Sequence, residues 1–134
     1  MSDLISKHIT YVEGIRTNVP KKNIPNDVQL KAMRNVAEKV FEPLRAWYGN
    51  PIIINSFFRS REVNAFVKGA STSQHLAGEA MDLTAGSKEE NKRLFDWIKN
   101  NLEFDQLINE YDFTWVHVSL KISGKQRKQI VIVK

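Results

Sequence analysis

The chain has 134 residues, of which 42% are hydrophobic and 26% are charged, and it contains no cysteine. These values are typical of one globular domain and exclude a disordered chain, a collagen-like chain and a coiled coil. Without cysteine, disulfides and thiolate metal sites are excluded, so a metal ion would need histidine, aspartate or glutamate ligands. The 20 basic and 15 acidic residues give a net charge of +5, which favours anionic partners such as nucleic acid, an acidic membrane or a cell-wall polymer.

The start of the chain carries no recognisable targeting segment. Residues 1–14 lack a basic stretch followed by an apolar core, so no secretory signal peptide is expected. The longest apolar run, 51–54, is far shorter than the ~20 residues that span a bilayer. We therefore expect a protein that is made in the cytoplasm and has no transmembrane segment. A monomer is expected.

The first half of the chain predicts one long helix after an irregular lead-in over residues 1–26. Asn26 or Asp27 is expected to cap the helix, because either side chain accepts a hydrogen bond from a free amide of the first turn. Apolar residues then recur with the spacing of one buried helix face as far as Trp47. Pro43 is expected to kink or locally break this helix, and Gly49 is expected to end it.

The second half predicts strands that alternate with two shorter helices. Ser87 with Glu90 forms a capping box, which marks the start of one of these helices. The expected elements are a strand at 52–54, a helix at 60–67, a small-residue loop at 69–74, a strand at 79–84, a helix at 87–101, and strands at 104–111, 115–120 and 130–133. The strands at 104–111 and 115–120 should form an antiparallel hairpin. The pattern predicts a single α+β domain over residues 1–134, with a small antiparallel sheet, flanking helices and a basic C-terminal strand or hairpin at 121–134.

Two of the three histidines lie where a metal ligand could lie. His8, in a polar stretch without a partner at ligand spacing, reads as a surface or capping residue. His75 follows the small-residue loop and precedes the strand that contains Asp82. Strand alternation places Asp82 opposite its two apolar neighbours, where a buried carboxylate needs a salt bridge, a helix N-cap or a metal ion.

His117 lies in the middle of the strand at 115–120, where it is either a core residue or a ligand. With His75 and Asp82 it would complete a three-ligand zinc set with an open fourth position, which is typical of catalytic zinc. Glu110, near the end of the preceding strand, would then lie close enough to exchange a proton with a zinc-bound water.

These residues resemble a known family. The string Ser73-x-His75-x-x-Gly78-x-Ala80-x-Asp82, followed by WVHVS at 115–119, is similar to the zinc D-Ala-D-Ala carboxypeptidase family. That family includes D-alanyl-D-alanine dipeptidases of the vancomycin-resistance type and phage L-Ala-D-Glu endolysins, and the hedgehog signalling domain shares its fold. Matching segments also lie at 42–45 (EPLR), at 55–60 (NSFFRS) and at 104–110, and the resemblance extends over about residues 6–120.

The resemblance implies a role for each matched residue. One zinc ion would be bound by His75, Asp82 and His117. Arg59 would bind the terminal carboxylate of the substrate or polarise its scissile carbonyl, since a guanidinium suits either task. Ser73 would help to anchor the substrate, and Glu110 would be the general base and acid.

One position departs from the family pattern. Many members carry the catalytic acid three residues before the last histidine, and here that position is Thr114, which cannot accept a proton. Glu110 lies seven residues before His117, an offset closer to that of the hedgehog-like and short phage-type members, and Asp112 is the second candidate. We favour Glu110, because the segment before it matches and a strand is a firmer platform than a turn.

The implied function is zinc-dependent hydrolysis of peptide bonds in peptidoglycan stem peptides, as a D-Ala-D-Ala carboxypeptidase or an endolysin-type endopeptidase. The alternative is a zinc-containing module that binds a wall peptide or a protein partner without cleaving it. No nucleic-acid binding is expected, since the basic segment at 121–134 lacks interleaved aromatic residues. With no signal peptide, a phage lysin or virion-associated enzyme that acts on the cell wall is the expected setting.

Overall fold

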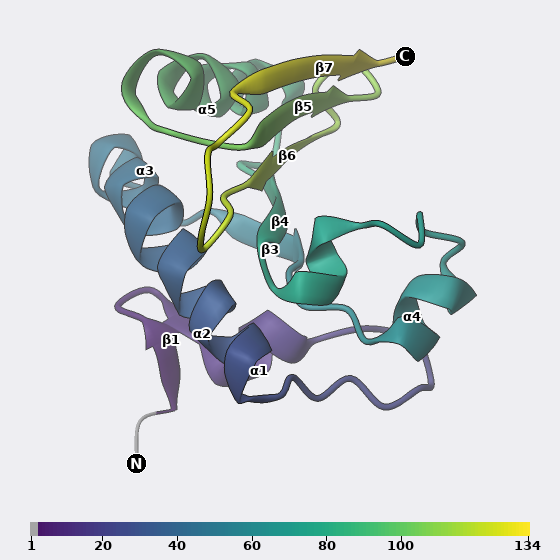
Figure 1. The fold of residues 1–134 in the computed structure, drawn as a ribbon. Helices are drawn as coiled ribbons and strands as arrows, with labels where there is room; N and C mark the ends of the chain where they lie inside the picture. Colours follow the sequence, from purple (N-terminus) through teal and green to yellow (C-terminus); the bar gives the residue numbers. More distant parts are fainter. Residues whose placement is uncertain (1–2) are drawn as a thin grey trace.

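The computed structural model describes residues 3–134, which form a five-stranded sheet with helices around it and a separate two-stranded sheet near the N-terminus (Figure 1). In chain order the elements are β1 (Leu4–Ser6), β2 (Ile9–Thr10), α1 (Tyr11–Ile15), α2 (Asp27–Val36), the π-helical turn η1 (Ala37–Phe41), α3 (Glu42–Tyr48), β3 (Ile53–Ser56), α4 (Arg61–Phe66), the 3-10 helix η2 (Gln74–Ala77), β4 (Ala80–Thr84), α5 (Lys88–Asn101), β5 (Gln106–Glu110), β6 (Trp115–Ser119) and β7 (Gln129–Val133). The α+β class expected from the sequence is confirmed.

The five-stranded sheet has the order β3-β4-β6-β5-β7 and is antiparallel except where β5 meets β7. Alternate residues of its strands, such as Leu83 and Val116, are buried in one core with Leu94 and Ile98 of α5. Because successive side chains of a strand point to opposite faces, the residues between them face the other side of the sheet. That other face carries Asp82 and His117.

The long helix is continuous in helical residues from 27 to 48, but its hydrogen-bond spacing changes before Pro43. The Glu42 amide donates to the Ala37 carbonyl, five residues earlier, which is the spacing of a π turn. Proline has no amide hydrogen and crowds the preceding turn, so the expected interruption takes the form of this wider turn. Asn26 caps the start of the helix, and Gly49, at φ 76°, ends it.

The lead-in expected to be irregular over residues 1–26 is wrong for its described first part. Residues 4–15 form the β1–β2 pair and the short helix α1, whereas 16–26 has no helix or strand. Glu42 fixes the strand pair, since its carboxylate accepts hydrogen bonds from the Ser6 hydroxyl, the His8 amide and His8 Nδ1. Burial raises the pKa of Glu42, but these partners outweigh it and the pKa lies below its usual value. His8 is a surface residue whose side chain is paired with Glu42, in line with the role expected from the sequence.

The C-terminal strand β7 pairs in parallel with β5, so it does not form a hairpin with β6 (Figure 1). The connecting residues 120–128 pass around the start of β5, where Asp105 is fully buried. The Asp105 carboxylate accepts hydrogen bonds from the backbone and the side chain of Arg127. The other expected strands and helices are present within two residues of their expected bounds. Among residues 3–134, no helix has the length and apolar character of a membrane span.

Candidate metal centre

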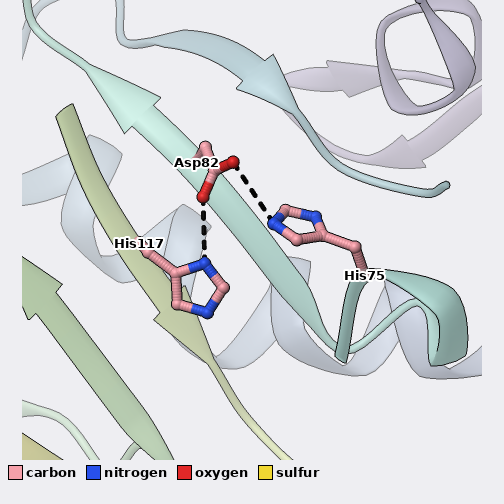
Figure 2. Close-up of side chains that lie close together, drawn as sticks. All are labelled: His75, Asp82 and His117. Atoms are coloured by element: carbon pink, nitrogen blue, oxygen red, sulfur yellow. Dashed lines mark hydrogen bonds and ion pairs between the residues drawn. The ribbon is translucent and has the colours of Figure 1, made fainter. Parts of the chain in front are cut away.

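His75, Asp82 and His117 converge on one point of the sheet, and Figure 2 shows Asp82 lying between the two imidazole rings. They come from three different elements: η2, β4 and β6. One potential ligand atom from each lies within 4.8 Å of the other two, and all three residues are buried. The arrangement expected from the sequence, with three distant residues brought together, is therefore present in the fold.

Sheet register and one tight turn produce this arrangement. Asp82 lies directly opposite His117 in the β4–β6 ladder, and His117 Nδ1 is 2.9 Å from Asp82 Oδ1. His75 arrives from η2, whose N-cap Ser73 accepts a hydrogen bond from the His75 amide. Gly78, at φ 76°, ends η2 and turns the chain into β4. A left-handed residue at this point is easiest for glycine, which has no Cβ.

The donor atoms fit a divalent metal ion. His75 Nδ1 lies 2.6 Å from the Phe57 carbonyl, which can only accept, so Nδ1 carries the hydrogen. In the neutral imidazole, Nε2 then carries a free lone pair. This buried atom has no hydrogen-bond partner among residues 3–134. It lies 3.3 Å from Asp82 Oδ2. Two ligands of a tetrahedral zinc ion, with bonds of ~2.0–2.1 Å, lie about 3.3 Å apart. The separation of these two atoms therefore suits zinc.

The charge of Asp82 is compensated on several sides. Burial alone raises the pKa of Asp82, but its contacts with His75 and His117 outweigh burial, so the pKa lies well below its usual value. Arg59 adds an ion pair, with Nη2 3.2 Å from Asp82 Oδ2. The carboxylate is therefore ionised, which is the state that binds a cation.

Arg59 is held rigidly beside the three residues. Its Nε donates to Ser56 Oγ at 3.1 Å, its Nη1 to Asn64 Oδ1 at 3.4 Å, and its backbone amide to the His75 carbonyl at 3.2 Å. The contact with Asp82 means that Arg59 also neutralises a candidate ligand, which the sequence did not indicate. Two of its five guanidinium hydrogens are left for another group.

A cavity of about 390 Å³ opens over the three residues, and Arg59, Ser73 and Glu110 also line it. Ile108 lies directly opposite His117, so the two side chains are on the same face of the sheet. Glu110 lies two residues further along β5 and is therefore on that face as well. Burial raises the pKa of Glu110, and the negative charge of Asp82 raises it further. A carboxyl group in this setting holds and releases a proton nearer neutral pH than an exposed one does.

Asp112, the second candidate acid, lies outside this cavity. Its side chain is 83% exposed, and it is 3.5 Å from the ammonium group of Lys88. The residue lies in the left-handed turn between β5 and β6, at φ 54°. The structure thus places Glu110, and not Asp112, on the same cavity as the His75–Asp82–His117 set.

Sequence reasoning missed several residues that line the cavity, including Gln74, Gln106 and Arg127. Gln74 and Arg127 both donate to the buried Asp105 carboxylate. The sequence shows only that Asp105 precedes a strand. Gln74 and Arg127 each lie more than 20 residues away from Asp105 along the chain. Local pattern cannot identify such partners.

A buried histidine–aspartate–histidine set that shares a cavity with one further carboxylate, in an α+β fold, is typical of a single-zinc hydrolase. The family comparison is more specific. The family model described as peptidase M15 matches residues 6–119, so the chain belongs to the M15 peptidases, the zinc-dependent metallopeptidases of the D-Ala-D-Ala carboxypeptidase type. This confirms the family resemblance expected from the sequence. No curated protein matches the chain.

Proposed function

We propose that this protein hydrolyses peptide bonds in peptidoglycan stem peptides, as a carboxypeptidase or an endopeptidase. One zinc ion would be held by His75, Asp82 and His117. The observation that carries the proposal is the single cavity that these three residues share with Glu110. Membership of a zinc-dependent peptidase family supports the metal and the reaction class, and the net charge of +5 suits an anionic wall.

In this mechanism Glu110 moves the proton. When bound, zinc supplies Lewis-acid chemistry that makes water a nucleophile at neutral pH and polarises the peptide carbonyl. The Glu110 carboxylate accepts a proton from the attacking water and then donates it to the nitrogen of the departing amine. Its partly buried position on β5 supports both transfers, because burial stabilises the protonated form between the two steps.

Arg59 and Ser73 would hold the substrate. The free guanidinium hydrogens of Arg59 would donate to the carbonyl oxygen at the cleaved bond or to a terminal carboxylate, and its three anchored contacts keep them in place. Ser73 lines the same cavity, and its hydroxyl oxygen also caps η2. Its hydroxyl hydrogen is thus the part that would bind the substrate.

The decisive experiment compares Glu110→Gln with Asp112→Asn, a matched change of one exposed carboxylate in the adjoining turn. Both variants should bind one zinc ion by elemental analysis, because neither residue belongs to the proposed ligand set. On a defined stem peptide, Glu110→Gln should lose at least ~100-fold in kcat, the usual scale for a general acid–base residue. Asp112→Asn should stay within about twofold of the unchanged protein.

The product masses from the same stem peptide separate the remaining possibilities. Loss of one terminal residue would identify a carboxypeptidase, and two internal fragments would identify an endopeptidase. A zinc-loaded protein that binds the peptide and yields no product would instead support the non-catalytic binding module. Equal activity of Glu110→Gln and the unchanged protein would refute the role of Glu110.

The proposed setting is the bacterial cell wall, with the protein acting as a phage endolysin or virion-associated enzyme. Purified walls would be the substrate, and loss of turbidity with release of new amino groups is the expected result. Size-exclusion chromatography would test the expected monomer.

A further inference from the structure

Arg127 lies in the segment after residue 119, outside the part of the chain that the family model matches, yet it lines the cavity over the candidate metal centre. It lies two residues before β7, which runs beside β5 at the edge of the sheet (Figure 1). The cavity therefore receives a cation from a connecting segment that the M15 match does not include. No role assigned above uses it.

The guanidinium of Arg127 is fixed by Asp105, which is fully buried. Arg127 Nη2 donates to Asp105 Oδ2 at 2.6 Å, Nε lies 3.1 Å from each carboxylate oxygen, and the Arg127 amide donates to Oδ1 at 2.8 Å. Gln74, next to His75, donates to the same carboxylate at 3.0 Å. This network holds the arginine before any ligand binds, so little side-chain entropy remains to be lost.

Part of the guanidinium remains free for a ligand. A guanidinium carries five N–H groups, and the contacts with Asp105 use Nε and one hydrogen of Nη2. Within residues 3–134, Nη1 of Arg127 has no hydrogen-bond partner, and the side chain is 50% exposed. One hydrogen of Nη1 and the remaining hydrogen of Nη2 therefore lie on a free edge of the guanidinium. A planar pair of hydrogens of this kind matches the two oxygens of a carboxylate.

The position of Arg127 separates it from the residues already assigned. Gln106, Ile108 and Glu110 alternate along β5 and all line the cavity. Ile108 lies opposite His117, so Gln106 and Glu110 lie on either side of the metal centre along the strand. Arg127 is hydrogen-bonded to Asp105, which precedes Gln106 in the chain. It therefore lies at the end of the cavity opposite Glu110.

The charge around Arg127 also favours an anion. Lys121 Nζ lies 3.7 Å from the same Asp105 carboxylate, so two cations face one buried negative charge. Of the two carboxylates that line the cavity, Asp82 lies opposite His117 at the metal centre and Glu110 lies beyond it, at the other end. Of the groups that a peptide can offer, a free carboxylate is the one that this excess of positive charge and the open guanidinium edge both suit.

We propose that Arg127 is a specificity-determining residue, which binds a free carboxylate of the peptide substrate at the end of the cavity opposite Glu110. This proposal rests on the peptidase function proposed above. It predicts that the enzyme distinguishes a substrate by a carboxylate that lies away from the cleaved bond. Arg59, from the other edge of the sheet, would remain free to act at the bond itself.

The test uses stem peptides that are identical except that one carboxylate at a time is converted to an uncharged carboxamide. For one member of this series, the unchanged enzyme should show a KM that is about 10- to 100-fold higher than for the free carboxylate, with similar kcat, the scale of one charge-assisted hydrogen bond. Arg127→Gln should show the same rise in KM on the carboxylate peptide and less than about twofold change on its carboxamide. Lys125→Gln, which removes an equal charge from the same segment, should match the unchanged enzyme on both.

A structural role of Arg127 gives a different result, because the Arg127→Gln variant would then lose activity equally on both peptides. That outcome, or equal KM values for every peptide pair with the unchanged enzyme, would overturn the proposal. The peptide-pair comparison needs no substitution, so it holds even if Arg127→Gln fails to fold.

Calorimetric titration of each peptide onto the zinc-loaded protein separates this proposal from the proposed function. If no peptide is cleaved, the proposed function fails. The carboxylate site would still be supported if the protein binds the carboxylate peptide more tightly and Arg127→Lys loses this preference, because lysine cannot reproduce the planar fork. Equal binding of both peptides would overturn it.

Discussion

Replacing Gly78 with alanine should destabilise the protein through the turn that brings His75 to Asp82. Gly78 has a φ of 76°, and its amide donates to the carbonyls of Gln74 and His75, which closes η2. A Cβ at this position would lie 2.5 Å from the Gln29 carbonyl oxygen and 2.9 Å from Met33 Cγ. The first contact is with the backbone of α2, which cannot rotate away.

Two effects set the size of the loss. A left-handed conformation costs a residue with a Cβ about 1–2 kcal/mol. Overpacking against the Gln29 carbonyl adds about 1–3 kcal/mol. The expected loss is therefore about 2–5 kcal/mol, a large part of the ~5–15 kcal/mol that stabilises a typical domain. Gly49→Ala is the matched control, because Gly49 has the same φ of 76° and nothing lies within 4 Å of the added Cβ.

The assay is urea denaturation of both variants without metal, followed by zinc competition with a chelator. Gly49→Ala should lose only the conformational part, about 1–2 kcal/mol, and keep its zinc affinity. Gly78→Ala should lose more stability and also bind zinc more weakly, since η2 must shift and it carries His75. Equal losses of stability in the two variants would refute the argument from the close approach of η2 to α2.

Two further predictions concern charged residues. Asp82→Asn should weaken zinc binding by more than the ~10- to 100-fold typical of outer-sphere partners, while Asp112→Asn leaves it unchanged; undiminished zinc binding by Asp82→Asn would contradict the ligand assignment. The hydrogen bonds from Arg127 hold the pKa of Asp105 at about 2, below the ordinary 3.8. The folded state therefore gains stability from this carboxylate above pH ~4 and loses it as the pH falls towards 2. Because Arg127 is half-exposed, solvent screening reduces the gain to about 1–2 kcal/mol. In denaturation curves, Asp105→Asn should be less stable than the unchanged protein at pH 7, and the difference should shrink on acidification; a difference independent of pH would contradict this.

The sequence predicted those parts of the structure that depend on local pattern. Apolar spacing located the long helix, and strand alternation set Asp82 apart from its buried neighbours. The pairing of Asp82 with His117 depends on the register of two strands that are far apart in sequence. Local pattern does not give this register, and the family resemblance was what assigned Asp82 and His117 to one metal site.

The parts that were missed depend on contacts between distant residues. The β1–β2 pair is too short for a periodic signal, and it is held in place by Glu42 on a helix more than 30 residues away. The parallel pairing of β7 depends on Asp105 and Arg127, which are 22 residues apart. For residues 121–134 the sequence left a strand or a hairpin open; the strand is present as β7, and it pairs with β5 instead of forming a hairpin.

The hydrogen bond from His75 to the Phe57 carbonyl has a consequence for how the centre tolerates sequence change. The atom that selects the imidazole tautomer belongs to the main chain, so every amino acid at position 57 offers the same acceptor. Substitutions there can alter packing yet leave the ring nitrogen facing Asp82 unprotonated. The chemistry of this histidine is thus encoded in the path of the backbone after β3, and only a change in that path would remove it.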